Sequence, residues 1–264
     1  MAASKSDPKS TTVAVAPALS PGEEAAAEAF GQLDFGEAPF VGLIGDTGTG
    51  KTYAAEYFVD LFLKKSPGSV FIADDKEMRA RFKGQERIDV EDLRKHPVDP
   101  ALPRSRVIVF RGVPSKAQKV DLETVAELAW RRVGHGRKTL IVADELISGR
   151  RNLTISSQWR SGVEWVPKTF TEGRSPGVGC IWGAQSPQLV PIDPFEQSNA
   201  IVCFRLAGLG LARLKERDYL LGGAGEVIPK LHGPPQPPAE RGDFVLLRRG
   251  QPWNGKIYKF RRAA

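Results

Sequence analysis

Cysteine, histidine and methionine are scarce in this 264-residue chain, which contains 2, 3 and 2 of them. Cys180 and Cys203 lie in apolar runs without a neighbouring histidine or second cysteine. This spacing argues against a zinc site and against a disulfide framework. We therefore expect two buried, reduced thiols. We assign no role to His96, His135 or His232, because their spacing is not that of metal ligands.

Long apolar runs are also absent. The longest uncharged stretch, residues 175–192, is interrupted by three prolines and two glutamines, which the hydrocarbon of a bilayer would not accept. The early apolar residues 13–19 include Pro17, and no cleavage pattern follows them. We expect a cytoplasmic protein with no membrane span and no secretory signal.

Positive charge is concentrated at the C-terminal end. Residues 205–264 contain 12 lysines and arginines against 5 acidic residues, so this region accounts for the whole net charge of +7. Such a region suits contacts with the phosphate backbone of nucleic acid, but a solvated basic surface is an equally good explanation. DNA binding therefore needs further support.

The order of patterns along the chain predicts an α/β protein. Apolar runs at residues 39–45, 69–73, 107–110, 140–143, 177–183 and 201–204 predict strands, and helical spacing marks 51–65 and 121–133. Near-continuous apolar strands alternating with helices indicate a mostly parallel sheet covered on both faces. We expect a flexible N-terminal arm over residues 1–36 and a core domain over 37–231. A proline-rich spacer and a basic β-hairpin are expected over 232–264.

A complete phosphate-binding loop joins the first predicted strand to the first helix: Gly45, Asp46, Thr47, Gly48, Thr49, Gly50, Lys51 and Thr52. The glycines let backbone amides approach phosphates, and the helix directs its positive dipole end at the same anion. Lys51 is expected to reach the β- and γ-phosphates of ATP, and the Thr52 hydroxyl to hold Mg²⁺.

Two carboxylates, Asp144 and Glu145, end the apolar strand at residues 140–143. We expect Asp144 to orient Mg²⁺ and Glu145 to activate the attacking water. A strand capped by surface acids is the ordinary alternative, which the preceding phosphate loop makes less attractive. This combination predicts a RecA-like P-loop NTPase of the additional-strand, catalytic-glutamate type.

Gln185 follows the next predicted strand, and Arg174 precedes it. A glutamine at that strand end could contact the γ-phosphate and respond to its loss. The alternative is an amide that satisfies the backbone of its own loop.

The phosphate loop, the Asp-Glu strand end and residues 173–187 (GRSPGVGCIWGAQSP) occur in the order found in the FtsK/HerA superfamily of DNA-pumping ATPases, which this chain resembles over about residues 40–206. Residues 199–206 resemble the last core strand of that superfamily. The usual Thr-Gln-Arg-Pro is replaced by Ala184, Gln185, Ser186 and Pro187, so the neighbours of the glutamine depart from the pattern.

The resemblance implies a homo-oligomeric ring, expected to be a hexamer, in which an arginine of one subunit completes the ATP site of the next. Arg174 is the first choice for that arginine, Arg205 the second and Arg217 the third. The implied track is double-stranded DNA bound without sequence specificity.

In layout the chain is closest to the minimal viral genome-packaging ATPases, which implies a capsid portal or vertex partner and a location in the host cytoplasm or the virion. A phage assembly or export ATPase similar to zonula occludens toxin remains an alternative, as does an ATP-binding scaffold. Basic and aromatic residues within 149–168 could supply DNA-gripping loops, a subunit contact or simple packing.

Overall fold

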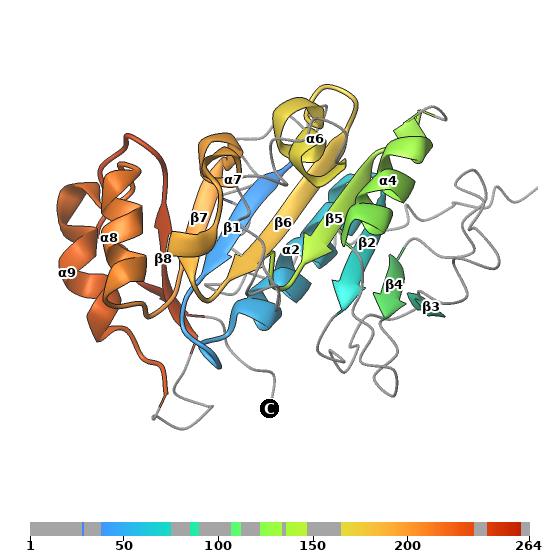
Figure 1. Cartoon of the computed structure of the whole chain (residues 1–264). Coiled ribbons are helices and arrows are strands. Elements are labelled where there is room, and N and C mark those ends of the chain that lie inside the picture. Colours follow the sequence, from blue (N-terminus) through green and yellow to red (C-terminus); the bar gives the residue numbers. More distant parts are fainter. Residues whose placement is uncertain are drawn as a thin grey trace, which may run out of the picture.

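The computed structural model describes residues 28, 38–74, 85–89, 107–111, 122–133, 136–146, 165–234 and 242–259. The flexible arm expected over residues 1–36, apart from Glu28, and the basic segment 149–164 lie outside the described residues. Within them the chain forms a nine-stranded sheet with helices packed on it (Figure 1).

The strands are β1 Phe40–Ile44, β2 Ser69–Asp74, β3 Gln85–Asp89, β4 Val107–Arg111, β5 Thr139–Ala143, β6 Val178–Ala184, β7 Ala200–Cys203, β8 Asp243–Leu247 and β9 Tyr258–Lys259. The helices are α2 Lys51–Lys65, α4 Leu122–Val133, α6 Trp165–Glu172, α7 Ile192–Gln197, α8 Leu209–Glu216 and α9 Ala224–Val227. Short 3-10 turns are η2 Pro187–Leu189, η3 Leu221–Gly223 and η4 Ile228–Lys230.

The sheet order is β3-β4-β2-β5-β6-β1-β7-β8-β9. From β3 to β7 every pair is parallel. The predicted parallel sheet is thereby confirmed. Because parallel strands end at one edge, the residues after β1, β5, β6 and β7 are brought together there.

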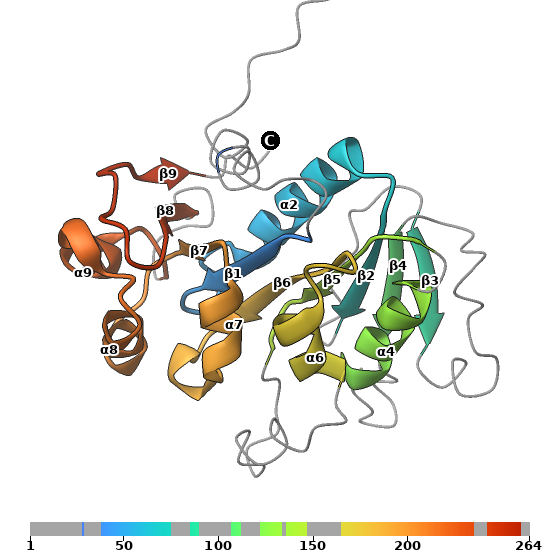
Figure 2. The same ribbon diagram turned by 90° about the horizontal axis from the view of Figure 1, so that it is seen from above.

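Each central strand contributes to two apolar cores, one on each face of the sheet. Phe40 and Ile44 of β1 pack into the core beneath α4, α6 and α7, whereas Val41 and Leu43 pack into the core beneath α2. Figure 2 shows α2 on one face and the other three helices on the opposite face. Side chains alternate across a strand, so burial of both faces explains the near-continuous apolar runs of the sequence.

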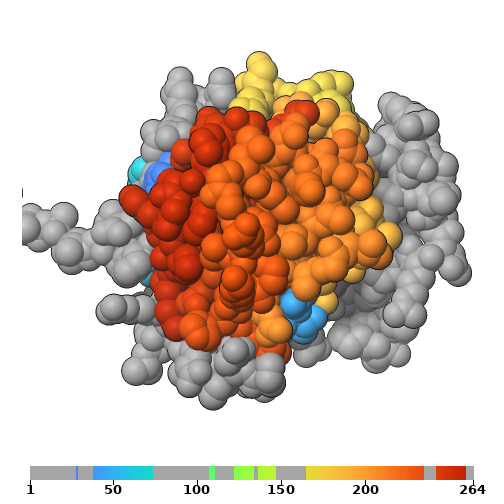
Figure 3. All heavy atoms as spheres, turned by 90° about the vertical axis from the view of Figure 1, so that its left-hand side faces the viewer, coloured from blue at the N-terminus to red at the C-terminus, as the bar shows by residue number. Residues whose placement is uncertain are grey.

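The C-terminal strands close the sheet on one side. β8 pairs with β7 antiparallel, and β9 pairs with β8 antiparallel, which confirms the hairpin expected in the tail. Together with α8 and α9, these strands form the surface in Figure 3. β3, α6 and α7 were not anticipated, because each is short and its pattern is weak.

Both cysteines are buried free thiols, as expected. Burial raises the pKa of Cys180, and burial followed by the negative charge of Asp46 raises the pKa of Cys203. No helix in the described part of the chain is both long and apolar enough to cross a bilayer.

Candidate active site

The phosphate loop leaves the carboxyl end of β1 and is held from both sides. The Gly45 amide donates to the Ala184 carbonyl at the end of β6 at 3.2 Å, and the Asp46 amide donates to the Arg205 carbonyl after β7 at 3.0 Å. Gly50 caps α2 with a φ of 116°, in the region that side chains disfavour. The loop is therefore fixed between its two neighbouring strands.

Lys51 lies inside the loop with only 7% of its surface exposed. Its ammonium donates to the carbonyl oxygens of Gly45 at 2.6 Å and Asp46 at 2.9 Å. Thr49, which is fully buried, donates its hydroxyl proton to the same Asp46 carbonyl at 2.8 Å. A positive charge is thus held at the mouth of a helix N-terminus, the arrangement that an oligophosphate requires.

Thr52 and Asp144 meet across the gap between α2 and β5. The Thr52 hydroxyl donates to Asp144 Oδ1 at 2.9 Å, and Asp144 is 8% exposed. A hydroxyl and a carboxylate are hard oxygen donors, which Mg²⁺ prefers, and both lie beside the loop where the phosphates would bind. The residues present therefore fit Mg²⁺, with Thr52 and Asp144 as its ligands or water-bridged neighbours.

Glu145 and Gln185 lie on the same flank of the loop. Glu145 Oε1 accepts a hydrogen bond from the backbone amide of Gln185 at 3.3 Å, and the Thr47 hydroxyl donates to the Gln185 side chain at Oε1, at 2.6 Å. Gln185 therefore bridges the carboxylate expected to act as base and the tip of the phosphate loop. A group in this position can respond both to the γ-phosphate and to the base.

Gly183 allows this flank to close. A Cβ at Gly183 would lie 2.0 Å from the Asp144 carbonyl oxygen, so only glycine permits the ends of β5 and β6 to approach this closely. The Leu146 amide then donates to the Gly183 carbonyl at 2.9 Å. Gly183 was not among the predicted site residues, although a glycine within an apolar strand is a recognisable signal of close backbone approach.

The three candidate arginines occupy different places. Arg174 precedes β6 at the opposite edge of the sheet, where its guanidinium donates to the Gln197 carbonyl at 2.7 Å and lies 5.5 Å from the centre of the Phe40 ring. It therefore does not join the site of its own subunit, and its role in a neighbour stays a prediction. Arg205 lies beside the loop and donates to the Pro234 carbonyl. Arg217 caps the C-terminus of α8.

Trp165, one aromatic residue of the 149–168 segment, packs against the core beside Trp130 at a ring-centre distance of 6.3 Å. Lys168 lies over both rings, at 4.5 Å from the Trp130 centre and 5.1 Å from the Trp165 centre. These contacts favour the packing interpretation for Trp165.

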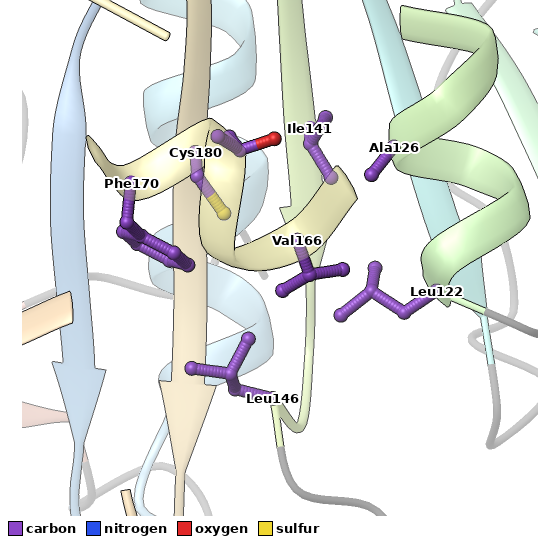
Figure 4. A pocket seen from close by; sticks show the side chains of 8 residues that line it. Leu122, Ala126, Ile141, Leu146, Val166, Phe170 and Cys180 are labelled. Atoms are coloured by element: carbon purple, nitrogen blue, oxygen red, sulfur yellow. The ribbon is translucent and has the colours of Figure 1, made fainter. Parts of the chain in front are cut away.

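A small cavity lies between α4, α6 and the sheet (Figure 4). Its lining residues are apolar except for one threonine: Leu122, Ala126, Ile141, Leu146, Val166, Thr169, Phe170 and Cys180. The Thr169 hydroxyl already donates to the Trp165 carbonyl and accepts from the Trp130 indole. The cavity therefore offers no group for catalysis, and the site lies at the carboxyl edge of the sheet.

Solved structures share this fold. The genome packaging NTPase B204 from Sulfolobus turreted icosahedral virus 2, in complex with AMP, matches 87% of this chain and 99% of its own at 16% identity and a TM-score of 0.56. Its ATP-gammaS complex matches 85% and 97% at 16% identity and a TM-score of 0.57. The pCW3 conjugation coupling protein TcpA, a monomer with ATPgS, matches 86% and 61% at 13% identity and a TM-score of 0.50.

No protein-family model matches the sequence. No curated protein sequence matches it either. The structural likeness confirms the predicted P-loop NTPase fold, and its neighbours are of the kind that the motif resemblance indicated. Because the identities are low, the likeness concerns the fold, and function must be argued from the site.

Proposed function

We propose that this protein hydrolyses ATP and uses the free energy to move DNA. The proposal that the protein hydrolyses ATP rests on three groups that lie together at the phosphate loop. Lys51 lies within the phosphate loop, and Asp144 Oδ1 is 2.9 Å from the Thr52 hydroxyl. Glu145 lies beside them and accepts a hydrogen bond from the backbone amide of Gln185. This set contains a phosphate cradle, a cation site and a base.

In the proposed mechanism each group has one task. Lys51 and the loop amides bind the β- and γ-phosphates and stabilise the charge that develops on them. Glu145 Oε1 or Oε2 accepts the proton of the attacking water, and Gln185 orients that water relative to the γ-phosphate. Mg²⁺ held by Thr52 and Asp144 would neutralise phosphate charge when bound.

The DNA part of the proposal rests on charge and on the kind of neighbours. The basic residues that the structure describes in the C-terminal region include Arg248, Arg249, Lys256 and Lys259, of which Arg249 and Lys256 are exposed. Such side chains bind phosphates without distinguishing bases. Neighbours described as genome packaging NTPases favour viral genome packaging, in which a homo-oligomeric ring, expected to be a hexamer, pumps double-stranded DNA through a capsid portal or vertex.

The test is ATP hydrolysis by the purified protein with and without long double-stranded DNA, with Glu145→Gln as the control. We expect DNA to stimulate hydrolysis and the variant to remove both the basal and the stimulated rates. Hydrolysis that depends on Glu145 but is not stimulated by DNA would contradict the DNA-motor proposal and favour an assembly or export ATPase. ATP binding without hydrolysis would leave only the alternative of an ATP-binding scaffold.

The likeness to a conjugation coupling protein favours a second candidate, DNA transfer between cells rather than into a capsid. Both are DNA motors, so the hydrolysis assay does not separate them. Packaging of DNA into purified empty capsids would do so, because a coupling-type motor has no docking site on a capsid vertex.

A further inference from the structure

Arg132, near the C-terminal end of α4, is buried although it carries a charge, and only 1% of its surface is exposed. α4 packs here on β2 and β5 (Figure 2). The Arg132 guanidinium lies 5.3 Å from the centre of the Phe71 ring, and its Nη2 donates to the Ser69 hydroxyl at 3.0 Å. Because Ser69 is the first residue of β2, the guanidinium lies at the amino edge of the sheet, opposite the phosphate loop.

The rest of this guanidinium is not satisfied. In the part of the chain that the structure describes, Arg132 Nε and Nη1 are buried without a hydrogen-bond partner. The two nitrogens belong to different edges of the planar group, so an acceptor at either edge satisfies one of them. Thr139 Oγ1, at the start of β5, is also buried and has no partner. Unsatisfied buried polar groups are costly and rare, so their presence together points to a missing ligand.

Two hydroxyls lie on the same face of the sheet as this guanidinium. Ser69 and Thr139 are register partners on the parallel strands β2 and β5, which places them on neighbouring strands about 5 Å apart. Phe71 and Ile141, two residues further along each strand, belong to the core beneath α4, so side-chain alternation directs both hydroxyls toward that helix. Ser69 Oγ accepts from Arg132, so its own proton remains to be donated, as does that of Thr139. Arg132, Ser69 and Thr139 form what we call the Arg132 cluster.

The charge of Arg132 also lacks a counter-ion among the described residues. Glu127 of the same helix pairs with Arg131 instead, at 2.6 Å. Burial, followed by the positive charge of Arg137, lowers the pKa of Arg132, but an arginine stays charged in proteins. The Phe71 ring and the carbonyl end of α4 offset part of this charge. A water molecule would satisfy hydrogen bonds without balancing the remainder, whereas an anion does both.

We propose that the Arg132 cluster binds a small monovalent anion of the halide class, with chloride as its ligand in solution. The Arg132 guanidinium and the hydroxyls of Ser69 and Thr139 donate to the ion. Because the cluster is buried, phosphate and other large anions do not fit the proposal. The ion joins α4 to β2 and to β5, the strand that leads to Asp144 and Glu145, and so stabilises the packing behind the candidate active site. This proposal does not depend on the proposed function.

Thermal unfolding of the whole chain tests the proposal, in potassium chloride and in potassium gluconate at the same ionic strength of about 0.15 M. Gluconate is too large for a buried site. We expect the wild type to unfold about 3 °C higher in chloride. Thr139→Val keeps the shape of the side chain and removes the hydroxyl, so it should lose most of that difference. Arg137→Met, which removes an exposed positive charge nearby, is the matched control and should keep it.

The opposite results are equally distinct. If no anion binds, Thr139→Val raises the unfolding temperature equally in both salts, because it removes an unsatisfied buried hydroxyl. That result would overturn the proposal. A chloride effect that Thr139→Val keeps and Arg137→Met loses would also overturn it, because the ion would then act at the surface.

Bromide gives a direct measurement, since it replaces chloride and is located by its anomalous scattering. In crystals of the whole chain grown with sodium bromide, we expect an anomalous peak beside the Arg132 guanidinium. Arg132→Met, a change that buried charges often tolerate, should remove that peak and leave any surface bromide in place. Bromide confined to the surface, or a water molecule beside Arg132 in its place, would overturn the proposal.

Discussion

The two flanks of the phosphate loop are built differently. On the β6 flank, Asp144, Glu145 and Gln185 each follow a buried strand directly, so parallel pairing alone brings them to the loop. On the β7 flank, Gly233 and Gly242 reach the loop only after the chain has passed through α8 and α9, and they lie just before β8. Short motifs therefore specify the chemistry, whereas the support of the loop depends on contacts made across the whole sheet.

The largest effect should come from the β6 flank. Asp144→Asn keeps the size of the side chain but removes the charge that faces Thr52, so hydrolysis should fall about 100-fold and need more Mg²⁺. Steady-state rates across a Mg²⁺ titration measure both changes. Asp218→Asn, an exposed position beyond α8, is the matched control, and equal rates for the two variants would remove Asp144 from the mechanism.

Phe204 tests whether the β7 flank supports the loop. It is fully buried and its ring centre is 5.7 Å from that of Phe244 in β8. Phe204→Ala should lower the free energy of unfolding by about 3–5 kcal/mol, as large-to-small core changes do, and should also weaken ATP binding. Phe71→Ala, in a buried position on β2, should cost similar stability. If Phe204→Ala and Phe71→Ala both bind ATP as tightly as the wild type where they are folded, the β7 flank does not differ from the rest of the core in supporting the loop.

Gly183 tests the close approach of β5 and β6 on the catalytic flank. Gly183→Ala would force the ends of β5 and β6 apart, and we expect it to cost about 1–3 kcal/mol of stability and to slow hydrolysis. Gly225→Ala is the control, because a Cβ there meets nothing closer than 3.6 Å and alanine favours the helix. Urea unfolding and hydrolysis rates should separate the two, and a wild-type rate in Gly183→Ala would contradict the role given to this approach.

The smallest effect should arise at the outer hairpin. The Tyr258 hydroxyl donates to Glu28 Oε2 at 2.7 Å, and burial followed by this hydrogen bond raises the Tyr258 pKa. Tyr258→Phe should cost about 1 kcal/mol at neutral pH.

The raised pKa also predicts the pH dependence. The stability that Tyr258 contributes is complete below the unfolded-state value of about 10 and is lost as pH rises through the folded-state pKa. Urea unfolding from pH 7 to 11 should therefore show a smaller alkaline loss in Tyr258→Phe than in the wild type. Identical losses would show that Tyr258 ionises alike in both states.

Much of the fold followed from local pattern. The apolar run before Gly45 and the helical spacing after Lys51 predicted β1 and α2, and the strand of Asp144 was placed correctly. β3 was missed because it carries the polar sequence QERID, which gives no apolar signal. Its pairing with β4 is a tertiary effect that propensity alone does not reveal.

Three features of the site could be recognised from the sequence: the phosphate loop, the strand that ends in two carboxylates and the glutamine after the next strand. Each is a short run whose chemistry depends on residue type and spacing. Folding adds contacts that these motifs do not specify: Gln185 bridges Thr47 and Glu145, Arg174 bonds to Gln197 at the far edge, and Arg205 and Gly233 cover the loop. These are contacts between residues far apart in the chain. They exist only after the sheet has closed, so no local pattern specifies them.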